Sequence, residues 1–434
     1  MTTSSLNKSI LRLALPNIIT NITVPLLGLV DLALMGHLGD PVYIGAVALG
    51  SVIFSMVYAG FGFLRMGTSG FTAQEFGAKN DIGISLALWR SLVVAIGIGF
   101  LLILLQKPIE LISFSILDGS NEVRELAKGY FRIRIWAAPA TLGLYTLYGW
   151  FLGLQDAKRP MIIAISINLI NIVLNFIFVY LFKMTSDGVA LASLIAQYSG
   201  LLIGVFFLVF KYGKFSVWQP LSELLDSTEL RKFFKVNSDI FIRTLALMLT
   251  LFFFTAMSAR MGDNMLAVNS MLIQFLYIFS YFSDGFAFAG EALVGKAHGG
   301  KNKTLLRKTI KYLFLWGWLA ALLISLVYLF GSGKIVSILT SDPDLRNIAY
   351  NYRWWVIVLP FTTIAAFIWD GVFIGLTASK QMRNVMLFSA FIVFFPSYFI
   401  SVGFFGNHSL WFAINLFMVV RSLLMWKASR GLVV

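Results

Sequence analysis

The 434-residue sequence contains no cysteine, and only 12% of its residues are charged. Without cysteine, disulfides, thiolate metal sites and a cysteine nucleophile are all excluded. A soluble domain is normally ~45–50% apolar and ~25% charged, whereas this chain is 59% hydrophobic. Such a chain cannot hide its apolar surface in water, because the surface of a folded protein falls too slowly with size. The composition therefore predicts a protein whose solvent is the lipid bilayer.

The sequence also lacks the patterns that indicate an enzyme or a nucleotide-driven pump. It has no glycine-rich phosphate-binding motif, its three histidines do not have the spacing of a metal site, and no nucleophile–base–acid set lies at membrane depth. We therefore expect no catalytic residues, no cofactor and no metal centre. The net charge of +14 is distributed between apolar segments, which favours a membrane topology over a nucleic-acid partner.

Long apolar runs dominate what is present. A run of about 18 or more mostly apolar residues is long enough to cross a bilayer as a helix. We predict twelve such spans, at residues 11–35, 44–70, 84–105, 130–153, 161–182, 188–210, 236–260, 266–294, 310–331, 350–376, 384–404 and 408–428. The predicted class is an all-α membrane protein with twelve transmembrane helices.

Lysine and arginine are unevenly distributed between alternate loops. With both termini on the same side, 22 of the 34 basic residues lie on that side, Arg421 among them, and 10 lie opposite, Arg134 among them. Arg65 and Arg243 fall inside spans. Because cytoplasmic loops carry the excess of basic residues, we expect a multi-pass protein of the inner (plasma) membrane with both termini cytoplasmic.

The two halves of the chain resemble each other at an offset of about 222 residues. The clearest pairs are Gly77-Ala78-Lys79-Asn80 with Gly299-Gly300-Lys301-Asn302, Gly149 with Gly371, and Gly153 with Gly375. Apolar bias does not explain matched glycines and loop residues, so we predict an internal duplication into two pseudo-symmetric six-helix lobes. The expected divisions are an N-terminal lobe at 1–215, a cytoplasmic connector at 216–235 and a C-terminal lobe at 236–434. Transporters often bind substrate at the interface of such repeats.

Several stretches resemble the multidrug and toxic compound extrusion (MATE) family, and its DinF-like branch in particular. They are Pro25-Leu-Leu-Gly-Leu-Val-Asp31, Gly39-Asp40, Phe63-Leu-Arg65-Met-Gly67-Thr68, Asp239-Ile-Phe-Ile-Arg243-Thr244, Asp284-Gly285-Phe286-Ala287, Glu291-Ala-Leu-Val-Gly295 and Trp369-Asp370-Gly371. The resemblance covers nearly the whole chain, although no single motif would be decisive alone.

The resemblance implies a V-shaped, two-lobed fold whose central cavity opens alternately to each side. It also implies a secondary active antiporter that exports small, amphipathic organic compounds in exchange for protons or sodium. The expected partners are the lipid bilayer and small-molecule substrates, and we expect a monomer.

Asp31 is the leading candidate for ion coupling in the first half. It follows Pro25 by six residues, and a proline inside a helix frees a carbonyl and kinks the helix. A carboxylate in an apolar setting can bind and release a proton near neutral pH, so protonation of Asp31 coupled to a bend at Pro25 would form a switch. The alternative is that Asp31 lies near the outer interface and only hydrates or caps there.

The fifth span carries Asn168, Asn171 and Asn175 on one helical face. In related MATE proteins the position of Asn175 is often aspartate, so this chain departs from the family at a protonatable position. Asp31 would then carry the proton largely alone, or a sodium ion would bind near Asp31 with Asn171, Asn175 and Ser193 supplying oxygens. The asparagines would otherwise hold helices together, as polar residues do in membranes.

The second half places acids and an arginine at membrane depth. Asp284 and Glu291 lie two turns apart in the eighth span, and Asp370 falls where the sodium-driven MATE branch has a cation-binding aspartate. That branch also has a glutamate in the seventh span, where this chain has Arg243. A buried arginine is normally paired, and the available partners are Asp239, Glu291 and Asp370.

Arg65 and Arg243 complicate a purely cation-exporting function. Arg65 could extend to the interface, pair with Asp31 or face the cavity, and two arginines in the cavity would favour acidic substrates. The alternative function is therefore an exporter or flippase of anionic or lipid-linked metabolites within the same superfamily. Arg65, Arg243, Asp284, Glu291 and Asp370 are the candidates for the substrate cavity.

Overall fold

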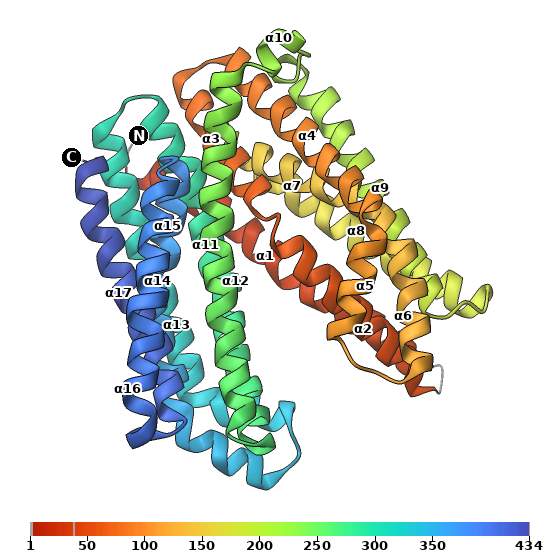
Figure 1. Ribbon diagram of the computed structural model, residues 1–434. Helices are drawn as coiled ribbons and strands as arrows, with labels where there is room; N and C mark the ends of the chain where they lie inside the picture. Colours follow the sequence, from red (N-terminus) through yellow and green to blue (C-terminus); the bar gives the residue numbers. More distant parts are fainter. Residues whose placement is uncertain (1–2, 38–39, 434) are drawn as a thin grey trace. The chain divides into compact units, whose positions relative to one another are not determined.

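The computed structural model describes residues 3–37 and 40–433, so that Gly39 of the quoted motifs lies outside the described residues. Within them every regular element is a helix (Figure 1). The prediction of an all-α protein is confirmed.

The helices follow one another with short connections. The first part of the chain contains α1 (Thr3–Gly36), α2 (Pro41–Ala59), α3 (Phe63–Ala78), α4 (Asp81–Leu104), α5 (Gln106–Ile116), α6 (Asn121–Arg134), η1 (Ile135–Ala137), α7 (Ala138–Gly153), α8 (Lys158–Phe176), η2 (Ile177–Leu181), α9 (Ser186–Tyr212), η3 (Gly213–Phe215) and α10 (Leu221–Leu224). The remainder contains α11 (Ser227–Arg260), α12 (Asp263–Gly299), α13 (Lys303–Leu339), α14 (Pro343–Gly375), α15 (Ser379–Phe388), η4 (Ser389–Phe394), α16 (Phe395–Phe405) and α17 (His408–Val433).

Eleven helical segments within the described residues are long and apolar enough to cross a membrane. The remaining predicted span, 130–153, is divided among α6, η1 and α7. Pro139 lies in the first turn of α7, where it cannot donate to the carbonyl of Ile135 and its ring crowds that carbonyl, which accounts for the break. Pro360 lies inside α14, which stays continuous.

The chain forms two compact units. One contains the described residues up to Ile18 and those from Phe234 onward, and the other is Ile19–Phe233. Helix α1 therefore contributes its first half to one unit and its second half to the other. The lobe boundaries predicted at 1–215, 216–235 and 236–434 assign all of α1 to the N-terminal lobe, and they stay a prediction. Below, Ile19–Phe233 is called the N-unit and the other the C-unit.

The duplication extends to the contacts between helices. A Cβ atom on Gly149 of α7 would collide with the carbonyl oxygen of Arg65 on α3, and one on Gly371 of α14 would collide with that of Ala287 on α12. Gly371 follows Gly149 by 222 residues, and Ala287 follows Arg65 by the same offset. Each glycine lets two helix backbones approach more closely than any side chain would allow.

The turns that follow α3 and α12 repeat in the same way. Lys79 and Lys301 both have positive φ, at 58° and 51°. The next residue begins the following helix in each unit: the side-chain oxygen of Asn80 accepts a hydrogen bond from the backbone N–H of Gly83 at 3.1 Å, and that of Asn302 accepts one from Leu305 at 2.9 Å. These are N-terminal caps. The paired geometry explains why Lys-Asn recurs in the sequence.

Candidate functional site

Asp31 lies near the end of α1 and is only 6% exposed. Its Oδ1 accepts a hydrogen bond of 2.6 Å from Nδ2 of Asn175 on α8. Asn175 and Asn171 are both buried and lie one turn apart on the same face of α8. Asp31 is therefore not hydrated at the interface, as the alternative interpretation expected, because its carboxylate is buried and hydrogen-bonded to a residue of α8.

Asn171 links this pair to α9. Its amide lies 3.0 Å from the Ser193 hydroxyl and 2.8 Å from Asn175. In the opposite amide orientation, Asn171 Nδ2 is 3.2 Å from Asp31 Oδ1, while its oxygen accepts from the Ser193 N–H at 3.3 Å. The structure therefore brings together the four residues predicted for ion coupling, and their role stays a prediction.

The third asparagine of the α8 face has a structural contact. Asn168 donates through Nδ2 to the carbonyl oxygen of Thr23 at 3.2 Å, which holds α8 against α1 two residues before Pro25. Helix α1 is helical throughout Thr3–Gly36, so Pro25 does not interrupt it. The predicted kink at Pro25 stays a prediction.

Arg134 is a neighbour of this site that the sequence analysis missed. It ends α6, donates to the hydroxyl of Tyr130 and to that of Ser51 (3.4 Å), and lies 5.1 Å from the ring centre of Phe54. It also interacts electrostatically with Asp31. Its position at the edge of a predicted span placed it among the outer loop residues. The signal in the sequence was Tyr130 four residues earlier, which puts both side chains on one face of α6.

The polar centre of the C-unit is an ion-pair triad. Oδ2 of Asp370 on α14 accepts from the guanidinium groups of both Arg243 on α11 and Arg421 on α17. All three residues are buried. Of the three partners considered for Arg243, the structure selects Asp370. Asp239 instead pairs with Arg383 at 2.5 Å and accepts from the Ser379 hydroxyl at 2.9 Å.

Arg421 was counted with the inner loop residues, and the structure corrects this. It lies inside α17 on a buried face. The signal in the sequence is the spacing of that face, because the buried residues Asn415, Met418, Arg421, Met425 and Ser429 recur every three or four positions.

The other predicted cavity residues lie on α12 and α3. Glu291 is 1% exposed, and Asp284 is half-buried and interacts electrostatically with Arg421. Arg65 is half-buried on α3 and interacts electrostatically with Tyr145 on α7. Their contribution to a substrate cavity stays a prediction.

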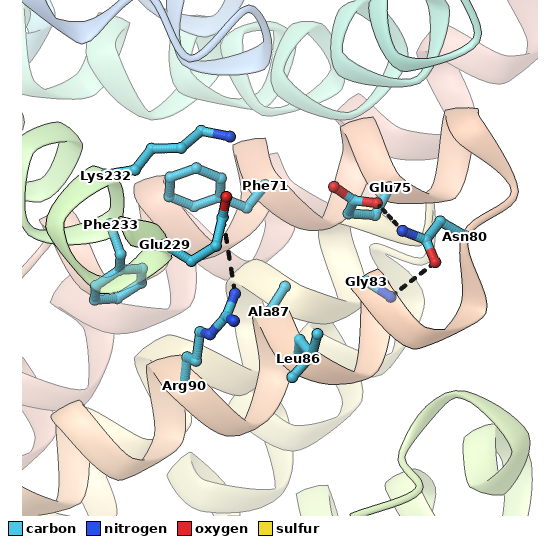
Figure 2. A pocket seen from close by; sticks show the side chains of 10 residues that line it. All are labelled: Phe71, Glu75, Asn80, Gly83, Leu86, Ala87, Arg90, Glu229, Lys232 and Phe233. Carbon is cyan, nitrogen blue, oxygen red and sulfur yellow. Dashed lines mark hydrogen bonds and ion pairs between the residues drawn. The ribbon is translucent and has the colours of Figure 1, made fainter. Parts of the chain in front are cut away.

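The N-unit also contains a cavity of ≈ 270 Å³ bounded by α3, α4 and the first turns of α11 (Figure 2). Its charged groups already engage protein atoms. Nδ2 of Asn80 donates to Glu75 at 2.8 Å, and Arg90 lies 3.8 Å from Glu229 while donating to the carbonyl of Glu223 at 2.5 Å. The cavity is therefore best explained as part of the attachment of the connector to α4.

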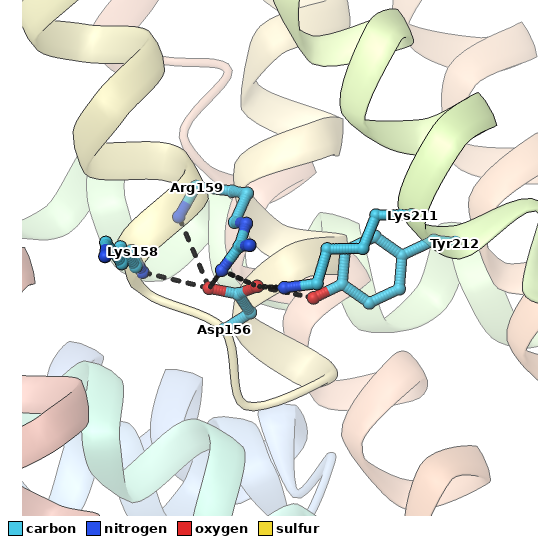
Figure 3. A network of polar contacts seen from close by, with 5 residues as sticks. All are labelled: Asp156, Lys158, Arg159, Lys211 and Tyr212. Carbon is cyan, nitrogen blue, oxygen red and sulfur yellow. Dashed lines mark hydrogen bonds and ion pairs between the residues drawn. The ribbon is translucent and has the colours of Figure 1, made fainter.

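A third polar cluster surrounds Asp156 in the loop between α7 and α8 (Figure 3). Its carboxylate accepts from the Tyr212 hydroxyl at 2.5 Å and pairs with Arg159 and Lys211, each at 3.1 Å. Burial by itself would raise the pKa of Asp156, but the hydrogen bonds from Tyr212 and Lys211 and the charge of Arg159 outweigh it and hold the pKa below its ordinary value. The cluster ties this loop to the end of α9.

Within the described residues, no group of three or more histidine, cysteine, aspartate or glutamate side chains has the arrangement of a metal site. What distinguishes the molecule is a set of long apolar helices, a duplicated framework and a few buried charges. These features define a multi-pass helical membrane protein, and internal repeats of this kind are common in transporters.

Comparison with known proteins identifies the family. The MatE family pattern matches residues 16–177 and 240–399. The chain is 38% identical over 425 residues to DNA damage-inducible protein F of Escherichia coli (strain K12). The matched region covers 97% of this chain and 91% of that protein. It is 25% identical to Protein DETOXIFICATION 45, chloroplastic, of Arabidopsis thaliana, over 97% of this chain and 79% of that one. The protein belongs to the MatE family.

The fold agrees with solved structures of transporters. A crystal structure of MATE in the bent conformation matches with a TM-score of 0.87 and 21% identity, over 99% of this chain and 95% of that one. A transporter of the MOP superfamily from Pyrococcus furiosus, described as having a binding pocket of reverse polarity, matches with a TM-score of 0.87 and 22% identity, over 99% and 96%. The resemblance to the MATE family, its DinF-like branch included, is confirmed.

Proposed function

We propose that this protein is a secondary active antiporter that exports small, amphipathic organic compounds by alternating access, with protons as the coupling ion and Asp31 as their binding site. The observation that carries the proposal is the 2.6 Å hydrogen bond between Asn175 and the buried Asp31 carboxylate. A carboxylate at membrane depth costs roughly 2.5–3.5 kcal/mol on insertion scales, which favours a functional role for it.

The amide partner suits a carboxylate that changes its protonation state. An ionised carboxylate only accepts hydrogen bonds, whereas a protonated one also donates. Asn175 has both a donor and an acceptor, and its Oδ1 has no hydrogen-bond partner among the described residues. After protonation, rotation of the Asn175 amide would let the Asp31 O–H donate to Oδ1. The pair can therefore be satisfied in both states without a second acid.

Sodium is the alternative coupling ion at the same place. Hard cations bind oxygen ligands, and Asp31, Asn171, Asn175 and Ser193 supply carboxylate, amide and hydroxyl oxygens within one hydrogen-bonded set. The unpartnered Oδ1 of Asn175 fits this use as well as it fits proton transfer.

The test is transport by purified protein in proteoliposomes. We expect efflux of a fluorescent organic cation when a proton gradient is imposed at constant sodium, and its loss in Asp31→Asn, which keeps the size and the acceptor but not the charge. Asp156→Asn is the matched control, because it removes a carboxylate of the same unit outside the site. Transport by Asp31→Asn at the wild-type rate would overturn the role of Asp31, and dependence on a sodium gradient alone would reassign the ion.

A second candidate function is export or flipping of anionic or lipid-linked metabolites. It is favoured by the C-unit triad, in which two arginines share the single carboxylate of Asp370, so that the triad has a net positive charge. Nε of Arg243 has no hydrogen-bond partner among the described residues. Under this proposal the protein transports an anionic dye, and Arg243→Gln abolishes that transport. Transport of cationic dyes alone would contradict the proposal.

We also propose that both termini are cytoplasmic in the inner membrane and that the protein is a monomer. The absence of cysteine makes the topology simple to test. Ser4→Cys and Gly431→Cys, both at exposed positions, should each be protected from a membrane-impermeant thiol reagent in whole cells and labelled after lysis. Labelling of either in intact cells would contradict the proposed orientation.

A further inference from the structure

A small cavity lies in the C-unit where α13 ends and α14 begins. Its volume is ≈ 170 Å³, and its lining includes Arg346, Arg353, Ser332, Asn347 and Tyr350. Arg353 and Asp370 both lie on α14, 17 residues apart, which corresponds to roughly 25 Å along a helix. The cavity is therefore separate from the ion-pair triad.

The lining offers hydrogen-bond donors and no carboxylate from the described residues. The guanidinium of Arg353 makes no hydrogen bond or ion pair within the described part of the chain, and it lies over the rings of Tyr350 at 3.8 Å and Trp354 at 4.9 Å. The rings fix the position of the cation and leave its N–H groups available. An arginine that is oriented but unpaired is a suitable donor to an oxyanion.

Arg346 is held beside it by the end of α13. Its Nε donates to the carbonyl of Thr340 at 2.9 Å, and its Nη2 lies 3.4 Å from that of Ser337. Nη1 is not used in either bond. The Ser332 hydroxyl is also without a hydrogen-bond partner among the described residues, although the residue is only 7% exposed. Two arginines and a hydroxyl are thus placed around one small space.

The depth of the cavity indicates which ligand reaches it. The predicted spans end at residue 331 on α13 and begin at residue 350 on α14, so we expect the cavity at the level of the lipid headgroups. Tyr350 and Trp354 are 59% and 55% exposed, as expected for aromatic residues at a membrane interface. Phe330 on α13 is 81% exposed and provides apolar surface toward the adjacent hydrocarbon.

We propose that this cavity binds the phosphate group of a phospholipid, with Arg353 and Arg346 as the charged donors and Ser332 and Asn347 as neutral ones. Arginine binds phosphate oxygens through two parallel N–H groups. The single negative charge of a phosphodiester offsets part of the positive charge of the two arginines, which no carboxylate of the lining balances. On the predicted topology the lipid belongs to the outer leaflet, on the side of the α13–α14 loop.

Lipid retention by the purified full-length protein tests the proposal. After delipidation and incubation with phosphatidylglycerol, native mass spectrometry should show one tightly retained lipid. We expect Arg353→Gln to reduce the retained fraction about tenfold, and Asn347→Asp, at an exposed position that should not affect folding, to reduce it severalfold by introducing a negative charge. Lys334→Gln is the control, because Lys334 is exposed on α13 but does not line the cavity.

Diacylglycerol and inorganic phosphate distinguish the possible sources of binding. Retention of phosphatidylglycerol but not of diacylglycerol supports recognition of the phosphate group. A different result would identify a soluble phosphate as the ligand and overturn the proposal. In that case inorganic phosphate stabilises the wild type against heat, Arg353→Gln abolishes this stabilisation, and no lipid is retained. Equal lipid retention by the wild type and Asn347→Asp would also overturn the proposal, and this test holds even if Arg353→Gln does not fold.

Discussion

The two units use the same framework to hold different charges. In the N-unit a single carboxylate, Asp31, accepts a hydrogen bond from a neutral amide, that of Asn175. In the C-unit Asp370 is held by two arginines. At the offset of 222 residues, Asp31 corresponds to Phe253 and Asp370 to Tyr148. Duplication thus preserved the glycine contacts and caps, while each unit acquired a polar site of its own.

The difference lies in what happens when the carboxylate loses its charge. Neutral Asp31 can still form a hydrogen bond with an amide, which donates and accepts. Neutral Asp370 would take away the carboxylate that both buried guanidinium groups share, which is costly. The N-unit site is therefore suited to changing charge during a transport cycle, whereas the C-unit triad is suited to keeping it.

The sharpest test of this comparison is to neutralise each aspartate and measure unfolding in mixed micelles. We expect Asp370→Asn to lower the free energy of unfolding by about 3–5 kcal/mol, the range for breaking a buried ion pair. Asp31→Asn should lower it by less than about 1 kcal/mol, because the hydrogen-bonded geometry survives. Equal losses would remove the distinction between a switching site and a structural one.

Removing one arginine from the triad should have a smaller effect. Arg421→Gln leaves Asp370 paired with Arg243, so the cost is that of one charge-assisted hydrogen bond, about 1.5–3 kcal/mol. The same unfolding measurement applies, with Lys334→Gln as a surface control. A loss as large as that in Asp370→Asn would mean that Arg243 alone cannot hold the carboxylate.

The duplicated glycines test what the units share. Gly149→Ala and Gly371→Ala each place a methyl group against a backbone carbonyl of the adjacent helix, so both should destabilise by about 1–3 kcal/mol through overpacking. Gly97→Ala is the control, because a Cβ there meets nothing within 4 Å. Destabilisation by only one member of the pair would show that the repeated contact is not equivalent in the two units.

The smallest effect is expected at Asp156, which has no acidic counterpart in the C-unit because the matching residue is Ala378. Its pKa is lowered in the folded protein. The stabilisation of the fold by ionised Asp156 is therefore fully present above the unfolded-state pKa of about 3.9. It is lost as the pH falls through the pKa of Asp156 in the folded protein.

The melting temperatures of the wild type and Asp156→Asn should accordingly differ by a constant amount from pH 7 to about pH 5 and converge below about pH 4. The difference corresponds to at most about 1 kcal/mol, because the network is partly solvated. A gap that grows as the pH falls would have the wrong sign for a carboxylate with a lowered pKa.

Much of the candidate site followed from helix periodicity. Asn171 and Asn175 were predicted to share a face with Ser193 nearby, and all three meet around Asp31. Arg134 and Arg421 were missed because basic residues near the ends of spans were assigned to loops. The prediction took the depth of a residue in the membrane from its position along the chain. The burial of both guanidinium groups instead depends on contacts with residues of other helices, which chain position does not reveal.

The sequence by itself determined the solvent, the helical class, the duplication and the family, because each depends on composition or on spacing along the chain. Only the tertiary structure decided which buried charge pairs with which. Asp370, Arg243 and Arg421 come from three helices, and Asp239, four residues before Arg243, pairs elsewhere. A local spacing allows such a pair, but the packing of distant helices selects the partner, because a buried charge is stabilised by whatever neighbour the fold places against it.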